Sequence, residues 1–247
     1  MCGRYSLTTP LEALRHLFDF AESPNLRPRY NIAPTQSVPV VRAGEGQGQH
    51  RRALGTMRWG LVPSFAKDIS IASRMINARG ETVAEKPAFR EAFRSRRCLV
   101  PADGYYEWRT EDGQRQPYRV TRKDGAPMAL AGVWERWTAG GDSGGANPVS
   151  AGDLVETFAI VTAAASESVR GLHHRMPVVV EPDDFEVWLT NSGEEIEPLL
   201  DLLRPSAISF AITRVGRHVN AVRNDDPQCI APEDVRAADA APGELPF

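Results

Sequence analysis

The sequence contains no long hydrophobic run and few cysteines. No apolar stretch approaches the roughly 20 residues of a membrane-spanning helix, so a helical membrane protein is excluded and no membrane partner is expected. The first residues, MCGRYSLTTPLEAL, lack the basic and then apolar segments of a secretory signal, and we expect a cytoplasmic protein. The 3 cysteines, Cys2, Cys98 and Cys229, are widely spaced and odd in number, which argues against a disulfide framework. No C-x-x-C pair or His/Cys cluster with zinc-ligand spacing is present, so we expect no metal and no cofactor.

Lysine is scarce, and charge is unevenly distributed along the chain. Only Lys67, Lys86 and Lys123 are lysines among the 29 basic residues, and the other 26 are arginines. Residues 1–136 carry 22 basic against 14 acidic residues, a net charge of +8, whereas residues 137–247 carry 7 against 18, a net charge of −11. The planar guanidinium group suits phosphate better than the point charge of lysine does. The basic half is therefore a candidate nucleic-acid surface, although charges of one sign also occur as a merely solvated surface.

Short runs of β-branched and aromatic residues, separated by glycine and proline, predict a β-rich fold. The predicted strands cover residues 2–7, 37–41, 53–59, 98–100, 104–108, 118–121, 129–134, 157–162, 176–180 and 208–212. Amphipathic helices are predicted over 9–20, where Thr9-Pro10-Leu11-Glu12 has the form of a capping box, and over 83–95. Because long helical stretches are lacking between most strands, alternating βαβ units are disfavoured. We expect an α+β fold that is largely antiparallel and β-rich, with a few peripheral helices.

We expect one domain over residues 1–230. The Gly/Ser/Asn-rich segment 139–153 is predicted to be a flexible loop within it, with a domain linker as the alternative. Residues 231–247 are rich in alanine, proline and acidic residues and are predicted to be a disordered tail.

Cys2 is the residue whose position suggests a specific chemical role most directly. It follows the initiator methionine, and a small second residue permits removal of that methionine. Removal places an α-amine and a thiol on one residue, with reference pKa values of about 7.7–8.0 and about 8.5. Such an aminothiol can attack an acyl group, with the amine as base, or an aldehyde, giving an imine that the thiol closes into a thiazolidine. A small residue without a chemical role is the remaining interpretation.

Seven sequence blocks resemble one known family. They are MCGRY at the start, RYNIAPTQ at 29–36, RWGLVPS at 58–64, INARGET at 76–82, RCLVPADGYYEW at 97–108, HHRMP at 173–177 and NDDPQCI at 224–230. Together they resemble the SRAP (SOS-response-associated peptidase) family over nearly the whole chain. The resemblance implies a single β-rich, barrel-like domain. It also implies a protein that recognises abasic sites in single-stranded DNA and links itself to them covalently through Cys2.

The resemblance further implies which residues assist Cys2. Glu107 matches the active-site glutamate of the family, a carboxylate that can accept the proton of the amine and help to expel water from the carbinolamine. His173 matches the active-site histidine, which can protonate the sugar ring oxygen, while the neighbouring His174 departs from the aspartate often found there. Asn77 matches a residue that orients the sugar or the Cys2 amine. We therefore predict Cys2, Asn77, Glu107 and His173 as the catalytic residues.

Five residues are predicted to contact DNA. Arg79 and Arg175 match phosphate-contacting positions of the family, and Arg4 adjoins the nucleophile as either a phosphate contact or a structural ion pair. Trp59 and Phe65 flank a short turn where an aromatic side chain can stack on a base beside the lesion, although Trp59 also suits a core or rim position. Such stacking is worth about 1–3 kcal/mol per base. The family typically carries tryptophan where Phe65 stands, so the stacking surface is smaller here.

The leading hypothesis is a monomeric covalent sensor or shield of abasic sites in single-stranded DNA, associated with the nucleoid if the source is a bacterium. Self-removal of Met1 and lyase-type strand cleavage are possible side activities. Class II glutamine amidotransferases also begin with Cys-Gly after methionine, but no acyl-site pattern accompanies these residues here. Two further hypotheses are a peptidase, as the family name suggests, and a plain DNA-binding module with an incidental Cys2. Only the leading hypothesis requires an adduct with abasic DNA that resists denaturant.

Overall fold

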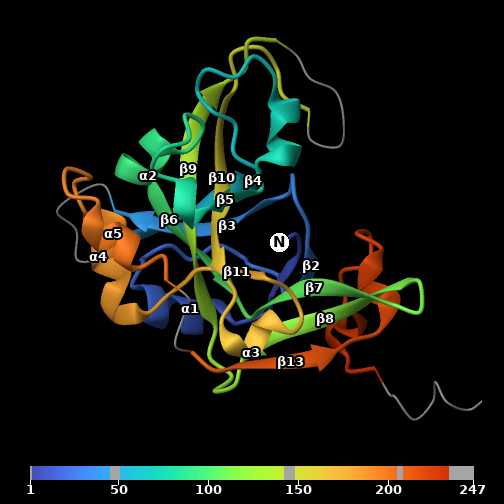
Figure 1. Ribbon diagram of the computed structural model, residues 1–247. Helices are drawn as coiled ribbons and strands as arrows, with labels where there is room; N and C mark the ends of the chain where they lie inside the picture. Colours follow the sequence, from blue (N-terminus) through green and yellow to red (C-terminus); the bar gives the residue numbers. More distant parts are fainter. Residues whose placement is uncertain (1, 45–50, 142–147, 205–207, 234–247) are drawn as a thin grey trace, which may run out of the picture.

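Two β-sheets contain the 13 strands of the computed structural model, which describes residues 2–44, 51–141, 148–204 and 208–233 (Figure 1). The first sheet consists of β1 (Tyr5–Leu7), β2 (Arg29–Ile32), β7 (Gly104–Glu111), β8 (Gln114–Arg122) and β13 (Phe210–Arg214). The second consists of β3 (Ser37–Ala43), β4 (Arg52–Trp59), β5 (Asn77–Arg79), β6 (Arg97–Ala102), β9 (Met128–Thr138), β10 (Leu154–Ala164), β11 (Arg175–Pro177) and β12 (Val179–Val180). The first sheet has the order β13-β8-β7-β1-β2 and is antiparallel throughout.

Five strands of the second sheet close into a barrel. β10 pairs with β4 on one side and with β9 on the other, and the succession β4-β3-β6-β9 completes the ring. All of these pairings are antiparallel except β10 with β4, and β5 also lies parallel to β10. The expected α+β, largely antiparallel and barrel-like fold is therefore confirmed.

The α-helices are short and lie around the sheets (Figure 1). They are α1 (Leu11–Phe18), α2 (Arg90–Ser95), α3 (Glu167–Arg170), α4 (Phe185–Thr190) and α5 (Glu197–Asp201). α1 buries Leu14 and Phe18, and the Phe18 ring stacks on Phe185 of α4 with 5.4 Å between ring centroids. Among the described residues, no helix is long and apolar enough to cross a membrane.

Two details of the predicted helices are wrong. The segment 83–89 forms turns and only Arg90–Ser95 is helical, because Pro87 lacks an N–H and disfavours helical backbone at the preceding residue. The capping box does not form, because the hydroxyls of Thr8 and Thr9 donate instead to the carboxylate of Asp103, at 2.7 and 2.5 Å.

The strand predictions hold with shifted ends, but β2 and β5 were not predicted. Each has only 3 or 4 residues, too few to show a clear alternation of apolar and polar side chains. The segment 139–153 connects the paired strands β9 and β10, although residues 142–147 lie outside the described part of the chain. The predicted tail from 231 likewise lies outside it from residue 234 onward, so both domain predictions stay predictions.

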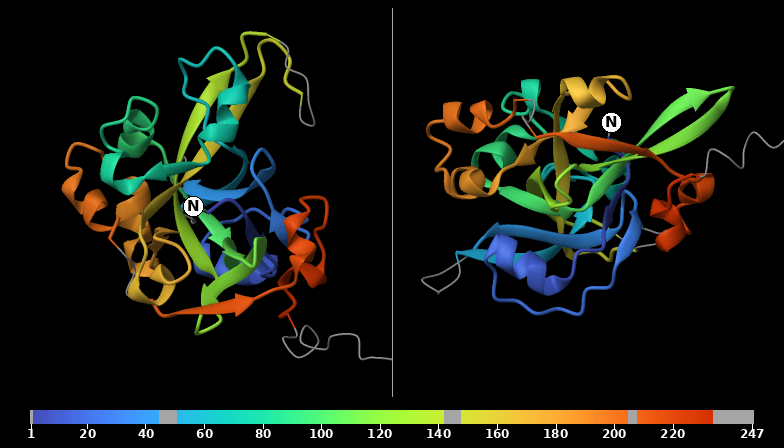
Figure 2. Two further views of the ribbon diagram at one scale, coloured as in Figure 1. Left: turned by 45° about the vertical axis from the view of Figure 1, so that its right-hand side comes forward. Right: turned by 90° about the horizontal axis from the view of Figure 1, so that it is seen from below.

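β1 fixes the start of the chain in the first sheet. It lies between β2 and β7, and its residues Tyr5, Ser6 and Leu7 are all buried. The N-terminal segment is thus part of the core, while the hairpin of β7 and β8 extends beyond the barrel (Figure 2).

Replacement of Gly60 by alanine is expected to destabilise the protein. Gly60 has φ +117° and turns the chain out of β4, and an added Cβ would lie 2.5 Å from the carbonyl oxygen of Ala72. Strain and clash together predict a loss of at least about 2 kcal/mol in the free energy of unfolding, measurable by chemical denaturation. The control is Gly113→Ala in the β7–β8 turn, where φ is +73° but no atom lies within 4 Å of the added Cβ. It should lose about 1 kcal/mol through backbone strain alone, and equal losses in the two variants would contradict the proposed clash.

Candidate active site

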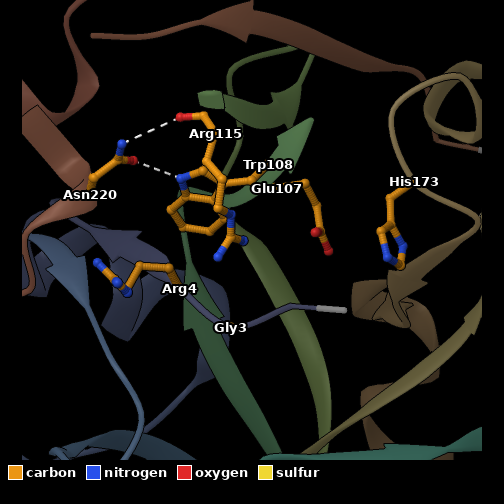
Figure 3. A pocket seen from close by; sticks show the side chains of 7 residues that line it. All are labelled: Gly3, Arg4, Glu107, Trp108, Arg115, His173 and Asn220. Atoms are coloured by element: carbon orange, nitrogen blue, oxygen red, sulfur yellow. Dashed lines mark hydrogen bonds between the residues drawn. The ribbon is translucent and has the colours of Figure 1, made fainter. Parts of the chain in front are cut away.

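A pocket of about 550 Å³ opens beside the start of β1 (Figure 3). Its lining residues are Gly3, Arg4, Glu107, Trp108, Arg115, His173 and Asn220. They come from segments far apart in the sequence: the N-terminus, the β7–β8 hairpin, the segment before β11 and the 3₁₀ turn Arg217–Asn220. The pocket thus brings Glu107 and His173, two of the predicted catalytic residues, next to the residue that follows Cys2.

The pairing of β1 with β7 positions the nucleophile. Tyr5 lies opposite Tyr105 in the antiparallel register. Continuing this register by two residues places Gly3 opposite Glu107, and both residues line the pocket. Cys2 therefore lies one residue from the position that faces the carboxylate.

Asn77 holds the backbone of Cys2. Its Nδ2 donates a hydrogen bond of 2.8 Å to the Cys2 carbonyl oxygen. Because Asn77 begins β5, which pairs with β10, this bond ties the first sheet's N-terminal segment to the barrel. The Oδ1 atom of Asn77 is buried and accepts no hydrogen bond from another described residue. Asn77 thus presents a free acceptor beside Cys2.

The surroundings of Cys2 favour a neutral thiol. Burial, and to a lesser degree the negative charge of Glu107, raise the pKa of the fully buried Cys2 thiol well above its usual value. Burial also raises the pKa of the Tyr5 and Tyr105 hydroxyls, with the Cys2 thiol as the next cause. Neither hydroxyl has a hydrogen-bond partner among the described residues. The thiol therefore stays protonated, and Glu107 is the acidic residue whose charge acts on it.

His173 faces the pocket and His174 does not. The two rings stack with 4.3 Å between centroids, but only His173 lines the pocket, and His174 is exposed. The backbone N–H of Arg175 donates to His173 Nδ1 at 2.9 Å, which in the neutral ring leaves the proton on Nε2. The Arg175 carbonyl oxygen lies 3.1 Å from the same atom and can accept a hydrogen bond when the ring is protonated. The Nδ1 atom of His173 thus has a backbone donor and a backbone acceptor within reach. Electrostatic repulsion from His173 lowers the pKa of the exposed His174.

The two arginines predicted to contact phosphate have different surroundings. Arg175 forms a bidentate ion pair with Glu81, at 2.7 and 2.9 Å, and donates to the Thr162 carbonyl oxygen at 2.5 Å. The hydrogen bond from Arg175 in turn holds the pKa of Glu81 below its usual value. Arg79 is exposed, and its side chain forms no hydrogen bond or ion pair with another described residue, although its charge contributes to the lowered pKa of Glu81. Of the two, Arg79 has its guanidinium group available for a ligand.

The prediction that Trp59 contacts DNA is wrong. Its side chain has no exposed surface, packs edge-on against Tyr5 at 5.3 Å between centroids and donates from Nε1 to the Ile76 carbonyl oxygen at 2.9 Å. Phe65, in contrast, is 67% exposed and remains available for stacking. Its loop is anchored by Trp137, whose Nε1 donates to the Ala66 carbonyl oxygen at 2.8 Å.

Arg4 is a structural residue of the pocket wall. Its Nη1 donates to Asn31 Oδ1 at 2.6 Å and to the Val219 carbonyl oxygen at 3.0 Å. Asn31 is itself fully buried and donates from Nδ2 to the carbonyl oxygens of Val219, Ala221 and Asn224, at 3.1, 3.1 and 2.6 Å. Asn31 therefore fastens the 219–224 segment, one wall of the pocket, to both β2 and Arg4.

Arg115, Asn220, Asn31 and Trp108 were not among the predicted site residues. Asn31 and Trp108 lie in sequence blocks that carry the family resemblance, so these blocks could have indicated them. Arg115 and Asn220 lie outside every such block, and only the folded chain brings them to the pocket.

One group of described residues has metal-ligand atoms close together. Atoms of His218, Asp226 and Cys229 lie within 4.8 Å of one another. His218 Nε2 and Asp226 Oδ2 are hydrogen-bonded at 2.9 Å, and the Cys229 thiol donates to the Asn224 carbonyl oxygen at 3.4 Å. These bonds account for all three groups without an ion, and the expected absence of a metal stays a prediction.

The model of the SOS response associated peptidase (SRAP) family matches residues 1–222. The chain belongs to this family. It is similar to abasic site processing protein YoaM of Bacillus subtilis, with 34% identity over 239 residues that span 95% of this chain and 99% of the relative. It is also similar to abasic site processing protein HMCES of Gallus gallus, with 32% identity over 83% of this chain and 66% of the relative.

Two solved structures share the fold of this chain. A protein from Bacteroides thetaiotaomicron matches with a TM-score of 0.75 and 24% identity, over 94% of this chain and 100% of that chain. A protein from Bordetella bronchiseptica matches with a TM-score of 0.68 and 26% identity, over 87% of this chain and 100% of that chain.

In this SRAP chain, Cys2 is expected to be unreactive while Met1 is retained. Because burial raises the thiol pKa, the thiolate fraction at pH 8 is small, and reagents have no access. Iodoacetamide should label Cys2 at least about 10-fold more slowly in the folded protein than in guanidinium chloride, as followed by peptide mass spectrometry. Free cysteine measured in both solvents controls for the effect of the denaturant on the reagent. Equal labelling rates in the folded and unfolded protein would contradict the burial of this thiol.

Proposed function

We propose that this protein captures abasic sites in single-stranded DNA by forming a thiazolidine between Cys2 and the ring-opened sugar, after removal of Met1. The observation that carries the proposal is the convergence of Asn77, Glu107 and His173 on the start of β1. The names of the Bacillus subtilis and Gallus gallus relatives, which call them abasic site processing proteins, support it.

The reaction consumes one aldehyde and one aminothiol and releases one water. The α-amine of Cys2 adds to the aldehyde carbon, and Glu107 accepts the proton that the amine loses and returns it as the carbinolamine expels water. The thiol then adds across the resulting C=N bond: a C–S bond forms, and the thiol proton ends on nitrogen. Asn77 Oδ1, which has no other partner among the described residues, accepts a hydrogen bond from the amine and so orients it.

His173 acts on the sugar. An abasic sugar is mostly a closed ring, and the aldehyde appears only when the ring opens. The protonated His173 ring donates its Nε2 proton to the ring oxygen during opening, and its Nδ1–H then faces the Arg175 carbonyl oxygen. When the sugar ring closes again, Nε2 takes the proton back.

The strand is held at the rim by Arg79 and Phe65. Arg79 is exposed, has no ion pair with a described residue and belongs to β5 beside Asn77, so a phosphate next to the lesion can reach it. Phe65 offers an exposed ring to a neighbouring base. Arg175 already pairs with Glu81, so it contacts a phosphate only if its guanidinium group binds the phosphate and Glu81 at the same time.

The deciding experiment mixes methionine-free protein with single-stranded DNA that carries one abasic site, and resolves the products on a denaturing gel. Wild type should give a heat-stable adduct. Cys2→Ser retains the amine but offers a poor second nucleophile, so it should give no stable adduct, only an imine that borohydride traps. An N-terminus extended by one uncleavable residue should abolish both products, because the amine becomes an amide.

DNA of the same sequence without the abasic site is the substrate control and should give no adduct. A stable adduct with the extended protein would refute the aminothiol mechanism. Release of ammonia from glutamine by the methionine-free wild type, without any adduct, would favour an amidotransferase.

Glu107→Gln is expected to slow adduct formation by roughly 10²-fold, because the amide keeps the shape of the side chain but cannot accept a proton. The rate is measured with saturating abasic DNA on denaturing gels. Glu12→Gln, on the exposed surface of α1, makes the same chemical change outside the pocket and should react like wild type. A Glu107→Gln rate close to that of wild type would show that Cys2 acts without this base.

A further inference from the structure

The side of the pocket opposite His173 is formed by the β7–β8 hairpin. Trp108 lies opposite Pro117, and Thr110 lies opposite Arg115. Trp108 and Arg115 are therefore diagonal neighbours on one face of the hairpin, within reach of long side chains. The Arg115 guanidinium carbon lies 5.5 Å from the centroid of the Trp108 ring, and Figure 3 shows Glu107 between this pair and His173.

Both the side chain and the backbone of Arg115 are in contact with neighbouring residues: the guanidinium group lies over Trp108, and the carbonyl oxygen accepts a hydrogen bond from Asn220. The Trp108 Nε1 donates to Asn220 Oδ1 at 2.7 Å, and Asn220 Nδ2 donates to the Arg115 carbonyl oxygen at 3.4 Å. The guanidinium group of Arg4 lies over the same indole, also at 5.5 Å. The indole that supports Arg115 is thus held by a hydrogen bond and a second cation.

The guanidinium group of Arg115 is nevertheless available. Arg115 is exposed and forms no hydrogen bond or ion pair through its side chain with another described residue. Two nearby arginines differ, because Arg109 on the hairpin and Arg214 on β13 both pair with Glu111. Arg4, the other arginine of the pocket, is bound to Asn31 and Val219. Arg115 is therefore the lining arginine whose N–H groups still lack an acceptor among the described residues.

The interior of the pocket is negatively charged, whereas its rim carries a positive charge. Glu107 is 4% exposed, so its side chain lies deep in the pocket and would repel a phosphate there. A phosphodiester strand can therefore place only an uncharged sugar beside Glu107 and must keep its phosphates at the rim. Arg79 does not line the pocket, but it lies two residues after Asn77 on β5, and Asn77 binds the Cys2 carbonyl oxygen. Arg115 lines the pocket on the hairpin side.

We propose that Arg115 binds a backbone phosphate of the DNA strand on the side of the pocket opposite Arg79, so that the two arginines hold the phosphates that flank the captured sugar. This inference rests on the proposed function and adds a binding residue to it. The planar guanidinium group, stacked on Trp108, is preorganised for bidentate contact with phosphate oxygens.

The test measures non-covalent binding to a fluorescein-labelled single strand of about 12 nucleotides without an abasic site, by anisotropy, between about 20 and 200 mM salt. Arg115→Gln keeps a side chain that can lie on Trp108 but removes the charge. We expect about 3–10-fold weaker binding at low salt and a log–log salt slope smaller by about 0.7, the value of one phosphate contact on a single strand. Arg115→Lys should retain the wild-type slope.

Arg94→Gln is the matched control. Arg94 is also exposed and without an ion pair to a described residue, but it belongs to α2, away from the hairpin (Figure 1). Its variant should bind like wild type. An unchanged salt slope for Arg115→Gln, or an equal loss for Arg94→Gln, would overturn the assignment of Arg115.

Parallel gels with abasic DNA separate this inference from the proposed function. If wild type forms the adduct and Arg115→Gln binds intact DNA as wild type does, only the role of Arg115 is refuted. If wild type neither binds the strand nor forms the adduct, the proposed function and this inference fail together.

Discussion

The backbone pairing of β1 between β2 and β7 is the interaction on which the site depends. Chain termini are usually poorly ordered unless a strand or helix ties them down. Here the first residues after Gly3 are tied on both edges, and Tyr5, Ser6 and Leu7 are buried. Residue 2 is therefore positioned by the strand pairing of its neighbours and by the hydrogen bond from Asn77 to its carbonyl oxygen. The register places it near Glu107 on the adjacent strand β7.

Many arginines of the basic half act inside the fold, not on DNA. Arg97 is 3% exposed and donates to the carbonyl oxygens of Phe93, Trp188 and Asn191, at 2.7, 2.5 and 2.5 Å. Burial lowers its pKa to about 10. Arg4 likewise donates to a buried amide and a backbone carbonyl. The net charge of +8 over residues 1–136 is therefore larger than the charge exposed on the surface. Several guanidinium groups instead donate hydrogen bonds to backbone carbonyl oxygens within the fold.

The sequence predicted the fold class, most strands and two of the residues that line the pocket, Glu107 and His173, but not the residues that support them. Strands β6, β7, β9 and β10 were predictable because their apolar runs are long enough to show a pattern. The supporting residues give no such signal: Asn220 and Arg115 are ordinary surface types, and they meet only because the 217–220 turn folds against the hairpin. Trp59 was misassigned because proximity to a turn does not indicate which way an aromatic ring points. Here its ring fills the space between Tyr5 and Phe158.

The burial of the site has a chemical consequence for the order of proton transfers. Cys2 and its neighbours Tyr5 and Tyr105 all have raised pKa values, so the surroundings of the nucleophile are neutral apart from Glu107. If removal of Met1 leaves an ammonium group on Cys2, this group and the carboxylate form an ion pair in a poorly solvated place. Transfer of the proton to Glu107 neutralises both charges at once and removes the desolvation cost of each. In the reaction proposed above, burial would therefore favour the neutral amine, and it keeps the thiol protonated. In that reaction the amine attacks first, and the thiol adds only once the imine carbon has formed.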